Sequence, residues 1–195
     1  MRRVLFLVLV AALGCAGARP RHAAALDEDD PAVEVTTVAD YYDVRGQTAN
    51  ELRRALGEDG PEEHGRRFDA RTTWRVEWKY QWDASPHACA IRQVALKLAV
   101  HYLLPRADPP APLLPRWQQH LAALGLHEDG HAANGHAAAA GVLRALRALP
   151  AQASCAVLDE AANEAARAVV RHFNEEDLAY DEETGHGKTE GAVFP

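Results

Sequence analysis

Two stretches of the chain alternate between apolar and polar side chains, and a period of two predicts β-strands. In residues 73–82, aromatic residues and a valine alternate with charged and amide side chains. Residues 90–104 alternate again, although their alanine and leucine content is also compatible with a helix. The β-branched residues 33–38 predict a shorter strand, and residues 41–44 are a candidate for another. We interpret the aromatic side of the 73–82 strand as a core face, with a ligand-binding platform as the alternative.

The second half of the chain changes to helical spacing. Residues 113–149 are rich in Leu, Ala, Arg and Gln, have no proline between Pro115 and Pro150, and predict one long helix. A second helix is predicted over residues 154–177, with apolar residues at helical spacing along one side. These elements predict an α+β fold, in which a small mixed or antiparallel sheet packs on two long helices.

Shorter segments connect these elements. Residues 83–88 predict a loop between the two long strands, and the Pro-rich residues 105–112 predict a connector before the first long helix. Thr48 and Glu51 have the spacing of a capping box, which predicts the start of a short helix that ends near Gly57.

The first residues have the pattern of a secretory signal peptide. Arg2 and Arg3 precede an apolar run over residues 4–13, and small residues at positions 16–18 form a cleavage site. The apolar run is too short for a membrane span and no second one follows, so we expect a secreted or periplasmic protein. A lipoprotein anchored through Cys15 is the alternative.

Three segments are therefore expected: a signal peptide over residues 1–18, a disordered lead-in over 19–32, and one folded domain over 33–195. The formal charge is -7, and loss of the two arginines of the signal peptide would make it -9 (-7 - 2). Such a balance disfavours nucleic acid, anionic membranes and strongly anionic substrates as partners.

After cleavage two cysteines would remain, Cys89 and Cys155. In an exported protein we expect them to form one disulfide, which would join the strand region to the second long helix. A catalytic cysteine with a histidine partner is the alternative.

The motif His127-Glu128-Asp129-Gly130-His131 lies inside the predicted first long helix. Residues four apart share a helix face, so His127 and His131 can converge on one zinc ion, and Glu128 can act as general base. Gly130 has a low helix propensity, which indicates a packing reason for its presence. By itself the motif can also arise by chance in a chain with 10 histidines.

A catalytic zinc site needs a third protein ligand. We expect His186, because it lies between Gly185 and Gly187 after the last helix signal, where the backbone can turn sharply. Asp181, predicted in the same tail, is an alternative ligand or a hydrogen-bond partner of a ligand imidazole.

Other candidates are weaker. His172 and Glu164 on the second long helix remain open as third ligands, although a packed histidine and a solvated carboxylate explain them as well. His136 would lie on another face of the first long helix, and His120 lies two turns away from His127, so we exclude both as ligands.

Several motifs in one order resemble a bacterial family of unknown function. They are Tyr41-Tyr42 with Val44 and Gly46, the segment 48–52, the strand of Trp74, Cys89, Pro105, His127-Glu128-x-Gly130-His131, Cys155, and Tyr180-Asp181-x-x-Thr184-x-His186-Gly187. The family is described as predicted secreted zinc-dependent proteases of the zincin-like metallopeptidase group. The resemblance implies a zincin-like domain over residues 33–195, with a strand edge above the motif helix on which an extended substrate lies.

The expected function is that of a secreted or periplasmic zinc metallopeptidase that acts on a peptide or protein substrate. Zn²⁺ would be held by His127, His131 and His186, Glu128 would deprotonate a zinc-activated water, and Tyr180 would donate a hydrogen bond to the oxyanion. One alternative is a non-catalytic exported domain that uses zinc to hold its fold or bind a partner. Another is hydrolysis of a non-peptide amide, for instance in the cell wall.

Overall fold

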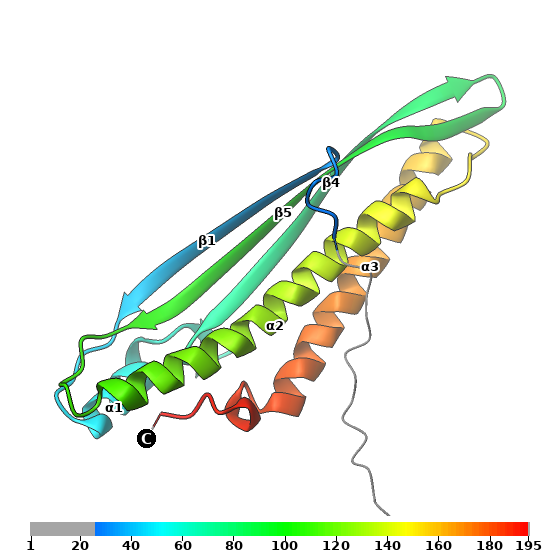
Figure 1. Cartoon of the computed structure of the whole chain (residues 1–195). Helices are drawn as coiled ribbons and strands as arrows, with labels where there is room; N and C mark the ends of the chain where they lie inside the picture. Colours follow the sequence, from blue (N-terminus) through cyan, green and yellow to red (C-terminus); the bar gives the residue numbers. More distant parts are fainter. Residues whose placement is uncertain (1–25, 195) are drawn as a thin grey trace, which may run out of the picture.

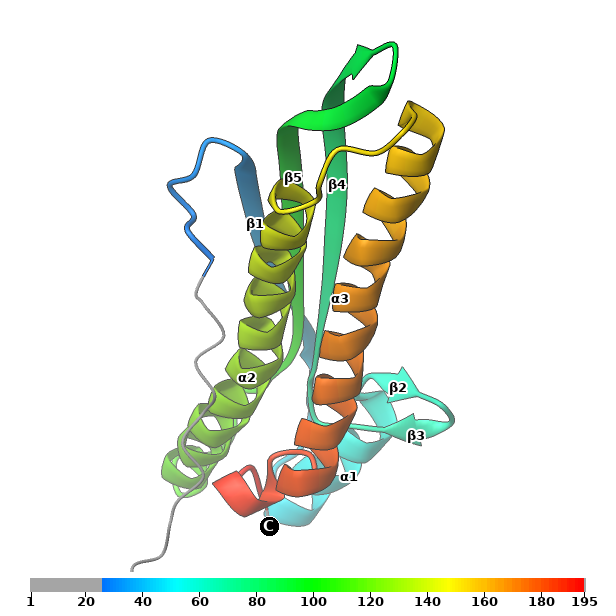
Figure 2. The same cartoon turned by 90° about the vertical axis from the view of Figure 1, so that its right-hand side faces the viewer.

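The computed structural model describes residues 26–194. Its three long strands, β1 (Val33–Asp43), β4 (Arg71–Ser85) and β5 (Ala88–Arg106), form a sheet in the order β1-β5-β4 (Figure 1). β1 is parallel to β5 and β4 is antiparallel to it, so the sheet is mixed. The long helices α2 (Leu114–Arg147) and α3 (Cys155–Thr184) lie side by side on one face of the sheet (Figure 2). The predicted α+β architecture is confirmed at this level.

Shorter elements follow β1. Helix α1 (Ala49–Asp59) starts at the predicted capping box, and a small hairpin of β2 (Glu62–Glu63) and β3 (Arg66–Arg67) comes before β4. A 3₁₀ turn, η1 (Lys188–Glu190), follows α3. The β2–β3 hairpin was not predicted, because its strands are too short for a periodic pattern to appear.

The two long strands are longer than predicted. β4 and β5 pair from Ser85 and Ala88 onward, so the predicted loop 83–88 shrinks to a two-residue turn. The Ser85 hydroxyl accepts a hydrogen bond from the Ala88 amide, which closes this turn without a longer loop. Residues 41–44 likewise form no separate strand, because β1 continues unbroken to Asp43. The helix alternative for residues 90–104 is wrong.

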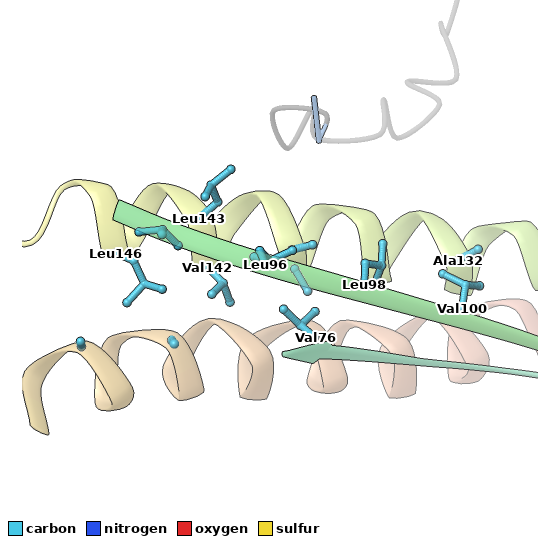
Figure 3. Packing of buried hydrophobic residues seen from close by; sticks show 13 residues of the cluster. Val76, Leu96, Leu98, Val100, Ala132, Val142, Leu143 and Leu146 are labelled. Carbon is cyan, nitrogen blue, oxygen red and sulfur yellow. The ribbon is translucent and has the colours of Figure 1, made fainter. Parts of the chain in front are cut away.

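The main core lies between the sheet and the two long helices. Alternate residues of β5 are buried, and Figure 3 shows Leu96, Leu98 and Val100 gathered with Val142 and Leu146 of α2. The aromatic face of β4 packs on the same core from Trp74 to Tyr80, as predicted, and its polar atoms bond to α3. Trp82 does not join this core and is 45% exposed, because a register shift between Gln81 and Trp82 interrupts the alternation. The indole nitrogens of Trp74 and Trp78 donate to Asp177 and Asn163, respectively.

The predicted disulfide between Cys89 and Cys155 is present. It joins the first turn of α3 to the start of β5, across a sequence separation of 66 residues. The bond therefore fixes the end of the helix pair where α2 finishes and α3 begins.

Helix α3 extends past its predicted end at residue 177, and this corrects the interpretation of the tail. Tyr180 and Asp181 lie on the last turns of the helix and not in a loop. The helix ends where Gly185 adopts a left-handed conformation (φ 59°) and the His186 amide bonds to the Asp181 carbonyl. Nothing between residues 177 and 184 breaks the helix, so it continues to the first glycine.

The predicted signal peptide, Cys15 and most of the lead-in lie outside the described residues. The described part of the lead-in contacts the domain: Asp30 accepts two hydrogen bonds from Arg147. Within residues 26–194, none of the helices has both the length and the apolar composition that a membrane crossing requires.

Candidate metal centre

The three functional residues of the motif lie buried on one side of α2. His127, Glu128 and His131 are 2%, 3% and 8% exposed, respectively. Gly130 is the residue of the motif that lets α3 approach: a Cβ at this position would lie 2.5 Å from the Tyr180 ring. The packing reason predicted for this glycine is confirmed.

Asp181 of α3 meets both histidines. Its Oδ1 atom lies 3.1 Å from His127 Nε2 and 3.2 Å from His131 Nε2. Within residues 26–194, these three residues are the group of His, Cys, Asp or Glu side chains whose ligand atoms all lie within 4.8 Å of one another. The antiparallel helices thus bring an i, i+4 pair of histidines against a carboxylate 50 residues further along the chain.

The other nitrogen of each imidazole is also bound to a carboxylate. Asp177 Oδ1 lies 3.0 Å from His131 Nδ1, and Glu190 Oε2 lies 3.0 Å from His127 Nδ1. Asp177 is itself held by the Trp74 indole and the Asn134 amide, at 2.6 and 2.7 Å. Both rings are therefore fixed with Nε2 facing Asp181, an orientation that outer carboxylates give to metal-binding histidines.

Asp177 and Glu190 were not identified from the sequence. Asp177 is spaced i, i+4 from Asp181, like the two histidines, and this signal was hidden because the predicted helix stopped at residue 177. Glu190 has no such local signal, because it reaches His127 from the 3₁₀ turn that follows the helix.

His186 lies next to the three-residue group. Its Nδ1 atom is 3.1 Å from Asp181 Oδ1, its ring packs on Phe68 at 4.5 Å between centroids, and its backbone is left-handed (φ 56°). It is not a member of the group whose ligand atoms lie within 4.8 Å of one another. The structure therefore brings His186 to the site as a neighbour of Asp181.

The other candidate ligands are elsewhere. The His172 side chain is 60% exposed near Glu176, and Glu164 pairs with Arg171 on the solvent side of α3. His136, which its position on the helix had already excluded as a ligand, forms an ion pair with Glu28.

His120 was also excluded as a ligand, and it is buried below the site. Its Nε2 atom lies 3.4 Å from Asp69, and burial lowers its pKa.

Tyr180 packs beneath His127. The two rings are nearly parallel, with centroids 4.9 Å apart, and the hydroxyl donates to Glu190 at 3.0 Å. Burial and the adjacent carboxylate of Glu190 raise the pKa of Tyr180. In this arrangement the hydroxyl is engaged with Glu190, and its role as oxyanion donor stays a prediction.

The charge balance of the site favours cationic histidines when no metal is bound. Burial opposes the charge on His131, but hydrogen bonds with Asp177 and Asp181 outweigh it and raise its pKa to about 10. Burial likewise opposes ionisation of Asp181, and the hydrogen bonds from the two histidines still hold its pKa below the usual range. A cation at this position would replace those protons and keep the same charge pairing.

Glu128 has a different environment. Burial raises the pKa of its carboxyl and the neighbouring Thr72 side chain opposes that rise, although neither Glu128 Oε2 nor the Thr72 hydroxyl makes a hydrogen bond of regular geometry within residues 26–194. Both residues line a groove of about 610 Å³ together with His127, His131 and Asp181. One wall of this groove comes from residues Arg71 to Trp74 of β4, which is an edge strand of the sheet.

A family model described as bacterial protein of unknown function (DUF922) matches residues 39–187, well over half of the chain. The chain belongs to this family. No curated protein and no solved structure matches it. The DUF922 match confirms the bacterial family to which the motifs point, and it includes the two histidines, Asp181 and His186. It ends before Glu190, the carboxylate behind His127.

The donor set of this DUF922 protein fits zinc. Imidazole nitrogen and carboxylate oxygen are both ordinary zinc ligands, and at bond lengths of about 2.0 Å the donors of a tetrahedral site lie about 3.3 Å apart. The distances of 3.1 and 3.2 Å from Asp181 to the two histidines are close to that separation. Three protein ligands would also leave one tetrahedral position free, as in catalytic sites.

Proposed function

We propose that this protein is an exported zinc metallopeptidase in which His127, His131 and Asp181 hold the metal and Glu128 is the general base. The observation that carries the proposal is the convergence of His127, His131 and Asp181, whose ligand atoms lie within 4.8 Å of one another, each imidazole being backed by its own carboxylate. The proposal takes Asp181 and not His186 as third ligand, because Asp181 contacts both histidines.

Zinc bound there would polarise a substrate carbonyl and make a water molecule acidic near neutral pH. Asp177 and Glu190 would accept the Nδ1 protons of the histidines, which leaves the Nε2 lone pairs directed toward Asp181. His186 would bond to Asp181 and limit its rotation.

Glu128 is suited to move a proton. Its carboxyl is buried beside the Thr72 side chain, and burial raises its pKa, which makes the carboxylate a stronger base than an exposed glutamate. It would take a proton from water and then donate it to the departing amine.

A peptide is the substrate that best fits the groove. The first residues of β4 form a free sheet edge beside Glu128, and an extended peptide can add to such an edge through main-chain hydrogen bonds. The disulfide supports an oxidising compartment, which agrees with the expected export.

The first experiment measures zinc per chain in the purified protein and in single variants. We expect one zinc in the parent, loss in His131→Ala and Asp181→Ala, and retention in the control His172→Ala, whose side chain lies away from the site. Absence of zinc in the parent after incubation with Zn²⁺ at neutral pH would refute the proposal.

Glu128→Gln separates metal binding from catalysis. It should keep its zinc and lose peptide hydrolysis by about 10²- to 10⁴-fold, because only the proton transfer is removed. A variant that retains full activity would rule out Glu128 as the base.

A non-catalytic zinc domain is the second candidate, and the proximity of His186 to Asp181 favours it. If His186 were a fourth ligand, the metal would have no position for water. Loss of zinc from His186→Ala together with loss from Asp181→Ala would support this closed site. Retained zinc with affinity weakened about 10- to 100-fold would support a neighbouring role for His186.

A further inference from the structure

A second cavity, of about 280 Å³, adjoins the metal centre on the side of the β2–β3 hairpin. It shares five lining residues with the groove: Arg66, Phe68, His127, Glu128 and His186. A substrate whose scissile bond lies at Glu128 can therefore extend one neighbouring group into this cavity.

The lining of the cavity divides into an apolar part and a cationic part. Leu124, Ala192 and Phe194 are buried and form the apolar part. Four cationic side chains face two carboxyl groups: Arg53, Arg66, Arg67 and Lys188 against Asp69 and Glu128. A local excess of positive charge is notable in a chain whose formal net charge is -7.

The four cationic residues differ in whether they form ion pairs within the described part of the chain. Arg53 is paired with Asp69, and Arg67 with Glu62. Arg66 and Lys188 have no ion-pair partner in the described part of the chain. The Arg66 guanidinium lies over the Phe68 ring, at 5.4 Å from its centroid, where it borders both the groove and the cavity.

The hairpin turn holds Arg66 in this place. Between Glu63 and Arg66, His64 and Gly65 both have positive φ angles (50° and 77°), the pattern of a two-residue type I′ turn. Lys188 lies on η1, directly after His186 and Gly187. The two cations without an ion-pair partner in the described residues thus reach the cavity from separate elements, and Arg66 also lines the groove of the candidate metal centre.

We propose that this cavity is a subsite for a carboxylate of the peptide substrate, carried on a residue adjacent to the scissile bond and bound by Arg66 and Lys188. The inference rests on the proposed function and names the substrate class. An acidic side chain and a free carboxyl terminus present the same chemical group, and the apolar lining accommodates the carbon chain that bears it.

The test measures binding to zinc-loaded Glu128→Gln protein, so that no substrate is consumed. Three hexapeptides serve as probes: an amidated alanine peptide with one glutamate, its glutamine counterpart, and the all-alanine peptide with a free carboxyl terminus. We expect a carboxylate peptide to bind about tenfold more tightly than the glutamine peptide, a difference of about 1.4 kcal/mol, because hydrogen bonds to a charged group are stronger than those to a neutral one. The tighter of the two carboxylate peptides identifies the source of the group.

Arg66→Gln combined with Lys188→Gln should abolish that preference and leave the glutamine peptide unaffected. The matched control is Lys79→Gln, because Lys79 is exposed on the β4 residues that point away from the helices. Equal binding of all three peptides to the Glu128→Gln protein would overturn the subsite. So would an equal loss of affinity for all three peptides when Arg66→Gln and Lys188→Gln are added.

Failure of the subsite can be distinguished from failure of the proposed function. If parent protein cleaves glutamate and glutamine peptides at equal rates, the subsite is wrong and the peptidase stands. If carboxylate binding depends on Arg66 and Lys188 but none of the peptides is cleaved, wherever the glutamate stands in the peptide, the subsite is supported and the proposed peptidase activity is wrong.

Discussion

Helices α2 and α3 pack antiparallel between the contact of His127 with Asp181 and the disulfide end (Figure 2), and the two ends of this shared stretch have opposite chemistry. At the end where α2 finishes, Val142 and Leu146 of α2 and Ala162 of α3 belong to one apolar core, and the disulfide lies at the start of α3. At the other end the contact consists of histidines and carboxylates.

The difference shows how one scaffold separates stability from chemistry. Apolar burial contributes free energy of folding, whereas burial of charged groups costs free energy unless every charge is paired. The polar end can be held in place because the apolar end and the disulfide already fix the alignment of the two helices. Substitutions at the two ends should therefore affect different measurements.

The largest expected effect on stability is at the disulfide. Replacing Cys89 and Cys155 with serine removes a cross-link over 66 residues and should lower the free energy of unfolding by about 4 kcal/mol. Denaturant unfolding measures the loss, and a reductant should destabilise the parent but not the double variant. Zinc content should be retained below the lowered melting temperature. Loss of zinc from the folded double variant would mean that the two ends are not separable.

Leu146→Ala tests the apolar end without changing the cross-link. Leu146 is fully buried, and its truncation should cost about 2–5 kcal/mol. Leu126→Ala is the matched control on the same helix, since that side chain is 69% exposed and should have little effect. Similar losses in the two variants would contradict the assignment of this end as the main core.

Gly130→Ala tests the closeness of the helices at the polar end. The added methyl group would overlap the Tyr180 ring, and overpacking of this kind costs about 1–3 kcal/mol, against about 1 kcal/mol gained in helix propensity. The second variant, Gly130→Ala with Tyr180→Ala, should recover the difference if the overlap is the cause. Additive losses in a double-mutant cycle would show that the two residues do not interact.

The last effect concerns pH and is specific to the polar end. In metal-free protein the pKa of His131 is raised to about 10, from an unfolded value of about 6.5. Its contribution to stability should therefore be complete below about pH 6.5 and lost as the pH rises through 10. Asp181 has the opposite dependence, because its pKa is lowered: its contribution is present above about pH 3.9 and is lost at lower pH.

Thermal unfolding in a chelator at several pH values checks this prediction. The decline toward pH 10 should be present in the parent and smaller in His131→Ala, while Leu146→Ala should keep the same decline from a lower starting stability. Part of the decline should remain in His131→Ala, because burial of His127 is outweighed by its bonds with Asp181 and Glu190 and its pKa is raised as well. A parent whose stability does not change between pH 6.5 and 10 would contradict the raised pKa.

The fold could be predicted from the sequence where a long periodic pattern determines it. The alternation in residues 73–82 predicts a strand with one apolar face, and the alternation in residues 90–104 favours a second strand although their composition is also compatible with a helix. The two cysteines likewise predict their own bond once an oxidising compartment is assumed. Parallel pairing of β1 with β5 could not be predicted, because partner choice depends on contacts between distant segments.

The site was predictable only in part, for a related reason. His127 and His131 lie four residues apart, so local helix geometry is sufficient to bring them together. Asp181 was considered in the wrong context, because the end of α3 was placed seven residues too early (184 - 177). Glu190 depends on the path of the chain after Gly185, which no local pattern encodes.

The turn after α3 has a practical consequence. Glu190 contacts His127, and four residues later Phe194 is buried against Trp117, so these residues join the candidate metal centre to a smaller apolar cluster that also contains Leu52 and Leu56 of α1. A protein truncated after Gly187 would keep His127, His131 and Asp181 and would lose Glu190, whose carboxylate bonds to His127 Nδ1. Affinity tags and surface-attachment linkers are therefore better placed on the amino-terminal side of the domain.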